Sequence, residues 1–283
     1  MKTLRTFISF CFFFVFLCLA EQFSHLSQYG IQYSFHQLNQ PRPIRIHALK
    51  IDLQKGSVKP VVIPAKDPDG PGQAEAVLTN PLELAKDKNV IAFVNTNPWD
   101  SFPDEKGKRN RNWYDGQPVD ITGLAATGGR LISPAGDGCV SVWTDSTGRF
   151  YISQKPDEKI MSEGVAGWYQ IVKARQIIPK QNETLNPLTG IGIDQTGYIV
   201  WLVVADGRQK GFSEGMSHYE LAEFMIGLGC YDVALMDGGG SSIMGISDEK
   251  GCIRIVNSPS DRILWIHRIR PLPLILAIKK SDS

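Results

Sequence analysis

The chain has 283 residues, of which 42% are hydrophobic and 10% aromatic, and this composition suits an ordinary folded core. With 30 basic and 29 acidic residues its formal charge is +1, so nothing in the charge indicates a nucleic-acid partner. The length allows one large domain or two small ones.

The first 20 residues have the organisation of a secretory signal peptide. A short basic start precedes an almost entirely apolar run over residues 7–19, and small residues then lead to a cleavage site after Ala20. The run is shorter than the ~20 residues that a spanning helix needs, although a retained anchor is the alternative. We therefore expect residues 1–20 to be removed and residues 21–283 to be secreted or periplasmic, with no stable membrane insertion.

Cysteine and histidine give no sign of a metal centre. Beyond the signal peptide the cysteines are Cys139, Cys230 and Cys252, which either form one disulfide with one thiol left over or remain three buried thiols. None of the five histidines has the spacing of a zinc motif. We predict neither a bound metal nor a cofactor.

Two strands, a short helix and a third strand are predicted in the first hundred residues. Rough alternation of apolar side chains favours a strand over residues 44–53, and a second short strand covers 58–63. Proline, glycine and aspartate residues make 66–73 a loop. A proline in the first turn starts a short helix over 81–88, and the apolar run over 90–94 predicts a buried strand.

A long polar loop over residues 98–118 follows that strand and carries four basic side chains. Loops of this length inside a compact domain are typically functional or disordered. The loop is either a solvated basic segment or a lid that contacts an anion. We predict that it borders the ligand site, because Trp99 and Trp113 would add aromatic faces to its cations.

Two hairpins are predicted in the second half of the chain. The first joins residues 140–144 to 149–153 through a turn with glycine, and the second joins 189–194 to 198–205. The last of these strands is apolar nearly throughout, which predicts a central strand that is covered on both faces.

The strongest helix signal begins at Ser217, which forms a capping box with Glu220. Apolar residues at the helical spacing from Leu221 onward form one stripe, and Gly229 stands where a left-handed C-terminal residue belongs. A buried strand over 231–236 follows. We therefore expect a single α+β domain with a mixed β-sheet core and a few packed helices.

Asp237 ends that last strand and opens the run Gly238, Gly239, Gly240, Ser241 and Ser242. Glycine lets backbone N–H groups approach a ligand closely, so such a loop can cradle a phosphate with amides and serine hydroxyls. The alternative is a tight turn in which Asp237 is only a cap. The run is not a dinucleotide fingerprint, a Walker loop or a nucleophile elbow.

Two further polar clusters stand at the ends of apolar strands. Asp206 and Arg208 would point to the same side of an extended chain, and arginine suits bidentate contact with phosphate. Asn95 follows the strand over 90–94. Each cluster alone is compatible with a surface turn, but the three together indicate one site.

Five segments are similar, in order and spacing, to the phosphodiester glycosidase family. They are residues 189–194, 203–208, 213–222, 228–230 and 235–242, within a close match over 187–245. The resemblance implies hydrolysis of the glycosidic C–O bond of a sugar-1-phosphodiester, such as an N-acetylglucosamine-1-phosphodiester, which leaves a phosphomonoester. The partner would be a sugar-phosphate or glycan substrate.

The resemblance also implies roles for individual residues. The catalytic residues would be Asp237, as base or ion-stabilising carboxylate, with Asp206 and Asn95 for positioning. Phosphate and substrate would be bound by Arg208, Thr189, Gly238, Gly239, Gly240, Ser241 and Ser242. The spacing of Glu220 favours a capping role for this residue.

The chain departs from the family pattern at three places. Leu188 stands where an arginine is usual, Leu235 where an asparagine is common, and the segment after Asn95 lacks the usual glycine and aromatic. The missing arginine would leave Arg208 or the basic loop to supply the positive charge. A binding protein for cell-surface glycans or sugar phosphates is the alternative function, and a phosphodiesterase that cleaves the P–O bond is a third.

Overall fold

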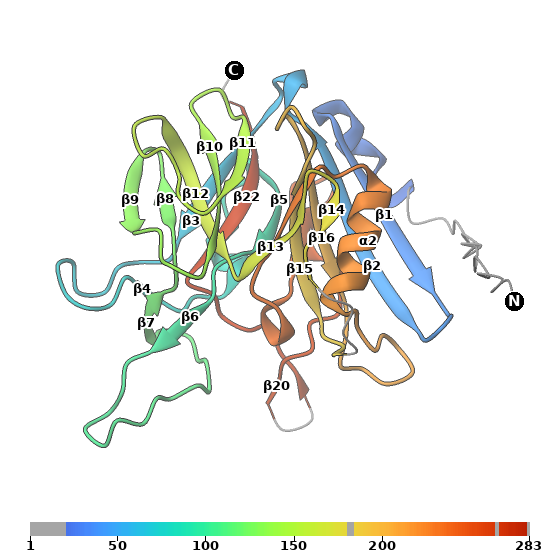
Figure 1. The fold of residues 1–283 in the computed structure, drawn as a ribbon. Helices are drawn as coiled ribbons and strands as arrows, with labels where there is room; N and C mark the ends of the chain where they lie inside the picture. Colours follow the sequence, from blue (N-terminus) through green and yellow to red (C-terminus); the bar gives the residue numbers. More distant parts are fainter. Residues whose placement is uncertain (1–20, 180–183, 264–265, 282–283) are drawn as a thin grey trace, which may run out of the picture.

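The computed structural model describes residues 21–179, 184–263 and 266–281, so the signal peptide predicted for residues 1–20 lies outside the described residues. The described chain forms one α+β domain in which β-sheets dominate, as Figure 1 shows. The predicted fold class is confirmed. Every pairing between named strands is antiparallel within the described part of the chain.

The largest sheet has seven strands in the order β1-β2-β16-β15-β17-β13-β14. Their bounds are β1 (Ile31–Leu38), β2 (Ile44–Asp52), β13 (Tyr169–Lys173), β14 (Gln176–Ile177), β15 (Leu188–Ile193), β16 (Ile199–Ala205) and β17 (Asp232–Leu235). The predicted hairpin of β15 and β16 is present, and β16 lies in the middle of the sheet, as its apolar sequence predicts.

The helix α2 (His218–Leu228) covers the outer face of this sheet, where it packs against β13, β15 and β17 (Figure 1). The predicted capping box between Ser217 and Glu220 is present, and Gly229 is left-handed with a φ of 109°. A Cβ at Gly190 in β15 would lie 2.7 Å from Met225 Sδ. Glycine in β15 therefore lets the helix lie close against the sheet.

Two five-stranded sheets form the rest of the domain. The second sheet contains β8 (Ala125–Thr127), β9 (Arg130–Ser133), β10 (Val140–Asp145), β11 (Phe150–Ser153) and β12 (Met161–Gly167). The third contains β3 (Val58–Pro64), β5 (Val90–Asn95), β18 (Met244–Ser247), β19 (Ile253–Ile255) and β22 (Leu274–Lys280). The predicted strands over 58–63, 90–94 and 140–153 are thus confirmed.

Shorter elements connect these sheets. The small sheets consist of β4 (Ala76–Val77), β6 (Trp99–Ser101) and β7 (Pro118–Ile121), and of β20 (Arg262–Ile263) and β21 (Ile266–His267). The short helices are η1 (Glu21–Tyr29), η2 (Leu53–Lys55), α1 (Pro81–Leu84) and η3 (Gly239–Ser241). The helix predicted over 81–88 therefore ends earlier than expected, because the residues after Ala85 are exposed and have no core to pack against.

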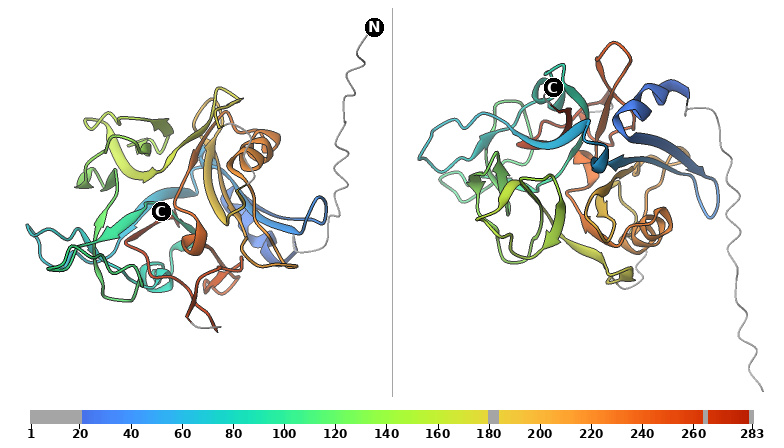
Figure 2. Two further views of the ribbon diagram at one scale, coloured as in Figure 1. Left: turned by 60° about the horizontal axis from the view of Figure 1, so that its bottom comes forward. Right: turned by 90° about the horizontal axis from the view of Figure 1, so that it is seen from above.

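The main core lies between the three large sheets, which Figure 2 shows from two further directions. Leu49 and Val204 come from the largest sheet, Val142 from the second and Val94 from the third, and each is at most 1% exposed. Each such side chain contributes about 1.5–3 kcal/mol on burial. The largest sheet thus has one face on this core and the other on α2, which explains its nearly continuous apolar strands.

The three cysteines of the described chain are all free thiols. Cys139 and Cys230 are buried and Cys252 is exposed. Burial raises the pKa of both buried thiols, which keeps them in the unreactive protonated form. Over the described residues, no helix has both the length and the apolar character required to cross a bilayer.

A buried carboxylate ties the second sheet to the third. Glu163 in β12 is 8% exposed, and its two oxygens accept hydrogen bonds from the backbone N–H groups of Val62 in β3, at 2.7 Å, and Gly128, at 2.9 Å. Burial raises the pKa of Glu163, although both hydrogen bonds act in the opposite direction. The carboxylate thus satisfies two amides that would otherwise be buried without a partner.

We predict that Glu163→Gln lowers the melting temperature of the protein. Glutamine keeps the shape but offers only one acceptor oxygen, so one of the two amides loses its partner at a cost of about 1–3 kcal/mol. Thermal melts of Glu163→Gln and of Glu158→Gln, an exposed control, make the comparison. Equal melting temperatures for both variants would show that the carboxylate does not hold the sheets together.

Candidate active site at the glycine-rich loop

The glycine-rich loop is pinned between the ends of strands from two sheets. The Asp237 N–H donates to the Thr96 carbonyl at 2.8 Å, just beyond β5. The Gly239 N–H donates to the Pro187 carbonyl at 2.9 Å, just before β15. The loop therefore lies at the edge where the largest sheet meets the third sheet.

Two guanidinium groups lie directly on the backbone of this loop. A Cβ at Gly239 would come within 2.8 Å of Arg208 Nη1, and a Cβ at Gly240 would overlap the Arg270 guanidinium. Gly239 also has a φ of 64°, which disfavours other residues. Glycine is needed here because any side chain would displace an arginine.

Each arginine is held by a second contact. Arg208 Nη2 donates to Asn186 Oδ1 at 2.9 Å. Arg270 pairs with Asp261 at 3.2 Å, and its Nη1 donates to Ser241 Oγ at the same distance. In the described residues Arg208 has no acidic partner within salt-bridge distance, so its charge is available to an anion.

Asp237 has a perturbed carboxyl group. Burial raises its pKa, and this effect outweighs the Ser241 hydroxyl, the Arg270 charge, the Gly238 amide and the Trp168 indole, which all act to lower the pKa. A strongly perturbed pKa next to specific charged groups is characteristic of catalytic carboxylates. Burial and directed polar contacts therefore oppose each other at Asp237.

Asn95 and Thr189 lie behind the loop. Asn95 is 1% exposed, its Nδ2 donates to the Asp237 carbonyl at 2.7 Å, and its Oδ1 accepts from the Ile243 N–H at 3.0 Å. Thr189 is fully buried and donates to the same Oδ1 at 2.7 Å. Both residues of the predicted site therefore hold the backbone on either side of the loop rather than facing solvent.

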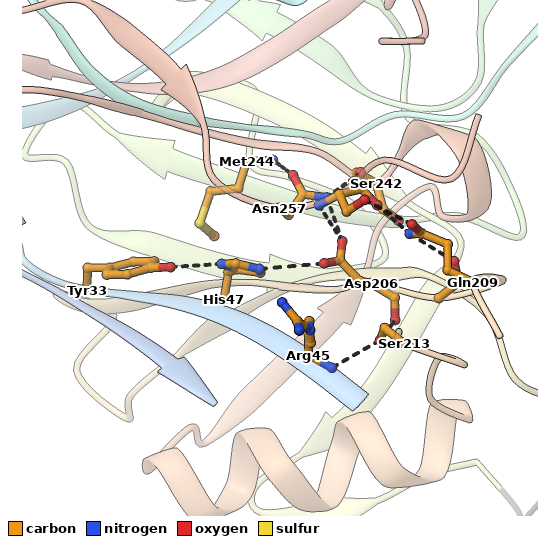
Figure 3. Close-up of polar contacts among 11 residues, drawn as sticks. Tyr33, Arg45, His47, Asp206, Gln209, Ser213, Ser242, Met244 and Asn257 are labelled. Carbon is orange, nitrogen blue, oxygen red and sulfur yellow. Dashed lines mark hydrogen bonds and ion pairs between the residues drawn. The ribbon is translucent and has the colours of Figure 1, made fainter. Parts of the chain in front are cut away.

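Asp206 is also buried, in a network that Figure 3 shows. Its Oδ1 accepts hydrogen bonds from Asn257 Nδ2 at 3.0 Å and the Ser258 N–H at 2.8 Å, while its Oδ2 lies 3.6 Å from His47 Nε2. Asn257 Nδ2 also donates to the Ser242 carbonyl at 3.1 Å. Asn257 thus connects Asp206 to the end of the glycine-rich loop.

The structure corrects the expected geometry of Asp206 and Arg208. The backbone is not extended at Arg208, which is left-handed with a φ of 58°. Asp206 points into the interior and Arg208 lies exposed against Gly239. The two residues therefore belong to neighbouring parts of the site rather than to one face of a strand.

The loop amides contribute less to anion binding than the sequence predicts. The N–H groups of Gly239, Ser241 and Ser242 all donate to backbone carbonyls of the protein. Ser242 is 1% exposed, which leaves its hydroxyl no route to solvent. The guanidinium groups of the exposed Arg208 and of the neighbouring Arg270 are therefore the stronger hydrogen-bond donors to an anion.

Several residues of the site carry no recognisable sequence signal. Arg270 and Asp261 lie well after the glycine run, and the short spacing of Arg268 and Arg270 was their only hint. Trp168 lies between β12 and β13, where its indole reaches Asp237 while 43% of the residue stays exposed. Only the folded chain brings these residues to the loop.

The long polar loop reaches the site indirectly. Arg268 Nη2 donates to the Asn112 carbonyl at 2.8 Å, and Arg268 shares Asp261 with Arg270. Two of the loop's cations are paired within the loop, since Arg109 and Arg111 both contact Asp100. The two tryptophans of the loop pack edge to face on each other, with centroids 5.6 Å apart. Its contact with the site therefore runs through Arg268.

Metal ligands are not gathered in the described part of the chain. No group of three or more histidine, cysteine, aspartate or glutamate side chains lies there in an arrangement that could hold an ion. The site is therefore built from one perturbed carboxylate, two guanidinium groups, hydroxyls and an exposed indole.

A family model for phosphodiester glycosidases matches residues 88–279, which include Asn95, Asp206, the glycine-rich loop and Arg270. The chain belongs to the phosphodiester glycosidase family. The resemblance found in its motifs is thereby confirmed. None of the curated proteins matches the chain.

Solved structures share the fold. The catalytic domain of zebrafish N-acetylglucosamine-1-phosphodiester alpha-N-acetylglucosaminidase, auto-inhibited by its pro-peptide, is 17% identical with a TM-score of 0.61, over 89% of this chain and 82% of that one. A hypothetical protein from Synechocystis is 11% identical with a TM-score of 0.55, over 89% of this chain and 62% of that one. At these identities the likeness concerns the fold.

We predict that Gly240→Ala reduces substrate turnover by about 10-fold or more, because the new methyl group displaces the Arg270 guanidinium from the loop. Gly227→Ala, in α2 with nothing within 4 Å of the new Cβ, is the matched control. Turnover and thermal melts of both variants are compared. Full turnover in Gly240→Ala would mean that the position of Arg270 is unimportant for the reaction.

Proposed function

We propose that the protein is a hydrolase that cleaves the glycosidic C–O bond of a sugar-1-phosphodiester and leaves a phosphomonoester. The observation that carries this proposal is the pairing of Asp237, a carboxylate of raised pKa, with two guanidinium groups on one glycine-rich loop. Family membership supports the same reaction class.

The guanidinium groups would bind the phosphate. Arginine forms bidentate hydrogen bonds with phosphate oxygens, and Arg208 and Arg270 lie on adjacent residues of the loop. When the glycosidic bond breaks, negative charge builds up on the departing phosphate oxygen. Two fixed positive charges stabilise that charge without rearrangement, and a phosphate leaves readily with little help from a general acid.

Asp237 would act as the general base. Its raised pKa makes it a stronger base than an ordinary aspartate, so it can take a proton from the water that attacks the sugar carbon. In the ionised form it also faces the positive charge that develops on the ring in the oxocarbenium-like transition state. The nearby Ser241 hydroxyl and Trp168 indole fix the direction of its oxygens.

The remaining residues would position these groups. Asn95 holds the backbone of Asp237, and the Thr189 hydroxyl in turn holds the Asn95 side chain. Asp206 acts through Asn257 on the Ser242 carbonyl. The partly exposed ring of Trp168 offers the sugar an apolar face beside the carboxylate. None of these residues needs to touch the breaking bond.

An N-acetylglucosamine-1-phosphodiester is the proposed substrate, by analogy with the name of the zebrafish enzyme. Leu188, at the usual position of a family arginine, is 3% exposed and lies near Gly238. The charge of Arg208 and Arg270 would serve in place of that arginine. A non-catalytic sugar-phosphate binding protein is the alternative that the absence of this arginine favours.

We predict that Asp237→Asn lowers turnover of a methyl phosphodiester of N-acetylglucosamine 1-phosphate by about 10²-fold or more. Asparagine keeps the shape and the capping ability of aspartate, so a residue that served only in a turn would tolerate it. The exposed Asp137→Asn is the control. Unchanged turnover in Asp237→Asn would refute the catalytic role, and an inactive unmodified protein would favour the binding-protein alternative.

The raised pKa of Asp237 also predicts the pH dependence of the reaction. A general base works when ionised, so the kcat/KM of the wild type should fall as the pH drops through the Asp237 pKa, which lies above the usual value of about 4 for an aspartate.

The Asp237→Asn variant tests the direction of the same pKa shift through stability. Because the folded-state pKa of Asp237 is raised, this residue favours folding at low pH, and its contribution is lost as the pH rises through that pKa. Asp237→Asn should therefore melt at the same or a higher temperature than the wild type at neutral pH, and a lower temperature would contradict the shift.

We also propose that the mature protein begins at Glu21 and is secreted or periplasmic, on the basis of the signal-peptide pattern in residues 1–20. Mass spectrometry of the protein recovered from its native host should find Glu21 at or within a few residues of the N-terminus. Intact Met1 in the membrane fraction would contradict cleavage and export.

A further inference from the structure

A cavity lies beside the glycine-rich loop, on the side of β1 and β2. Its volume is about 620 Å³, and its walls include Tyr33, Phe35, Arg45, His47, Asp206 and Phe212. Asp237, Arg208 and Arg270 are not among its lining residues. The cavity therefore shares Asp206 and Asn257 with the site described above but is not lined by the proposed catalytic carboxylate.

Aromatic side chains form much of the cavity wall. Phe23 packs edge to face on Tyr33, with ring centroids 5.0 Å apart, and Phe35 and Phe212 add further rings. Aromatic rings that line a cavity in this way suit a flat or ring-shaped ligand with apolar C–H groups. The cavity is thus shaped for a ring rather than for an ion alone.

Arg45 supplies an uncompensated positive charge. Its guanidinium lies over the Phe212 ring, 3.9 Å from the centroid, and its Nε is buried without a hydrogen-bond partner. In the described residues no acidic side chain lies within salt-bridge distance of it. Stacking on one face leaves the N–H groups at its edge free to bind an anionic group.

Tyr33, His47 and Asp206 form a row along one side of the cavity (Figure 3). Burial and the charge of Asp206 raise the pKa of Tyr33, so its hydroxyl stays protonated and can donate to His47 Nδ1 across 2.8 Å. With Nδ1 accepting from Tyr33, the imidazole proton lies on Nε2, which faces Asp206 Oδ2.

The spacing of His47 Nε2 and Asp206 Oδ2 suits a ligand hydroxyl that contacts both atoms. The separation of 3.6 Å between Nε2 and Oδ2 is too long for a direct hydrogen bond. Asp206 is 1% exposed, and its Oδ2 accepts no hydrogen bond within the described chain. A ligand hydroxyl beside the pair can accept from Nε2–H and donate to Oδ2 at once.

We propose that this cavity is a second ligand site, which binds a sugar ring that carries a phosphate or carboxylate group. The rings of Phe35 and Phe212 would contact the sugar ring, Arg45 its anionic group, and His47 with Asp206 one of its hydroxyls. Because Asn257 joins Asp206 to the Ser242 carbonyl, this site adjoins the end of the glycine-rich loop.

Calorimetric titration with glucose 6-phosphate tests the site in an Asp237→Asn/Arg208→Met double variant, which removes the proposed catalytic carboxylate and one of the two guanidinium groups proposed to bind phosphate there. The double variant should keep the affinity of the cavity for glucose 6-phosphate. Adding Arg45→Met should weaken this binding about 10-fold or more, while Arg130→Met, an exposed arginine in β9, should leave it unchanged. Glucose and inorganic phosphate, each lacking one half of the ligand, should bind at least about 10-fold more weakly.

Phe212→Ala provides a second test of the cavity if Arg45→Met fails to fold, since Phe212 is 36% exposed. It should weaken binding by removing the ring on which Arg45 stacks. No binding by the double variant, or binding that neither Arg45→Met nor Phe212→Ala weakens, would overturn the proposal. These outcomes do not depend on turnover, so they are separate from the test of the catalytic reaction.

Discussion

The contact of two guanidinium groups with bare backbone is the constraint on which the site depends. Arg208 and Arg270 lie on consecutive glycines, Gly239 and Gly240, where side chains would keep them away. Two like charges on neighbouring residues of one loop are costly unless anions compensate them. Asp261 partly neutralises Arg270, and the incoming phosphate would complete the balance. Gly239 and Gly240 are therefore required by the arginines, and they need not themselves bind the ligand through their amides.

The fold delivers these groups because strands of different sheets end at one place. β5 brings Asn95, β15 brings Thr189, and β17 leads into Asp237. Asn95 hydrogen-bonds to the backbone at Asp237 and at Ile243, so it holds both ends of the loop. The burial that raises the Asp237 pKa follows from this convergence. A buried carboxylate costs stability when ionised, and such a cost is common where function needs a perturbed group.

Sequence patterns predicted the parts of the fold that local chemistry determines. The capping box at Ser217, the apolar strand β16 and the glycine-rich loop are each encoded in neighbouring residues, and the structure contains all three. β1 was not predicted, although Ile31, Tyr33 and Phe35 alternate with polar residues in the period of two that is typical of a strand, and its pairing with β2 makes the strand plain. The left-handed conformation of Arg208 likewise had no sequence signal.

The candidate site was predicted less completely than the fold, because its residues meet only in three dimensions. Arg270, Trp168 and His47 come from distant segments without a motif.

The central claim is hydrolysis at the glycosidic C–O bond, and the most direct test is turnover of a sugar-1-phosphodiester in water labelled with the heavy oxygen isotope. The account predicts the label on the released sugar. Label on the released phosphate would mean cleavage of the P–O bond and would contradict it.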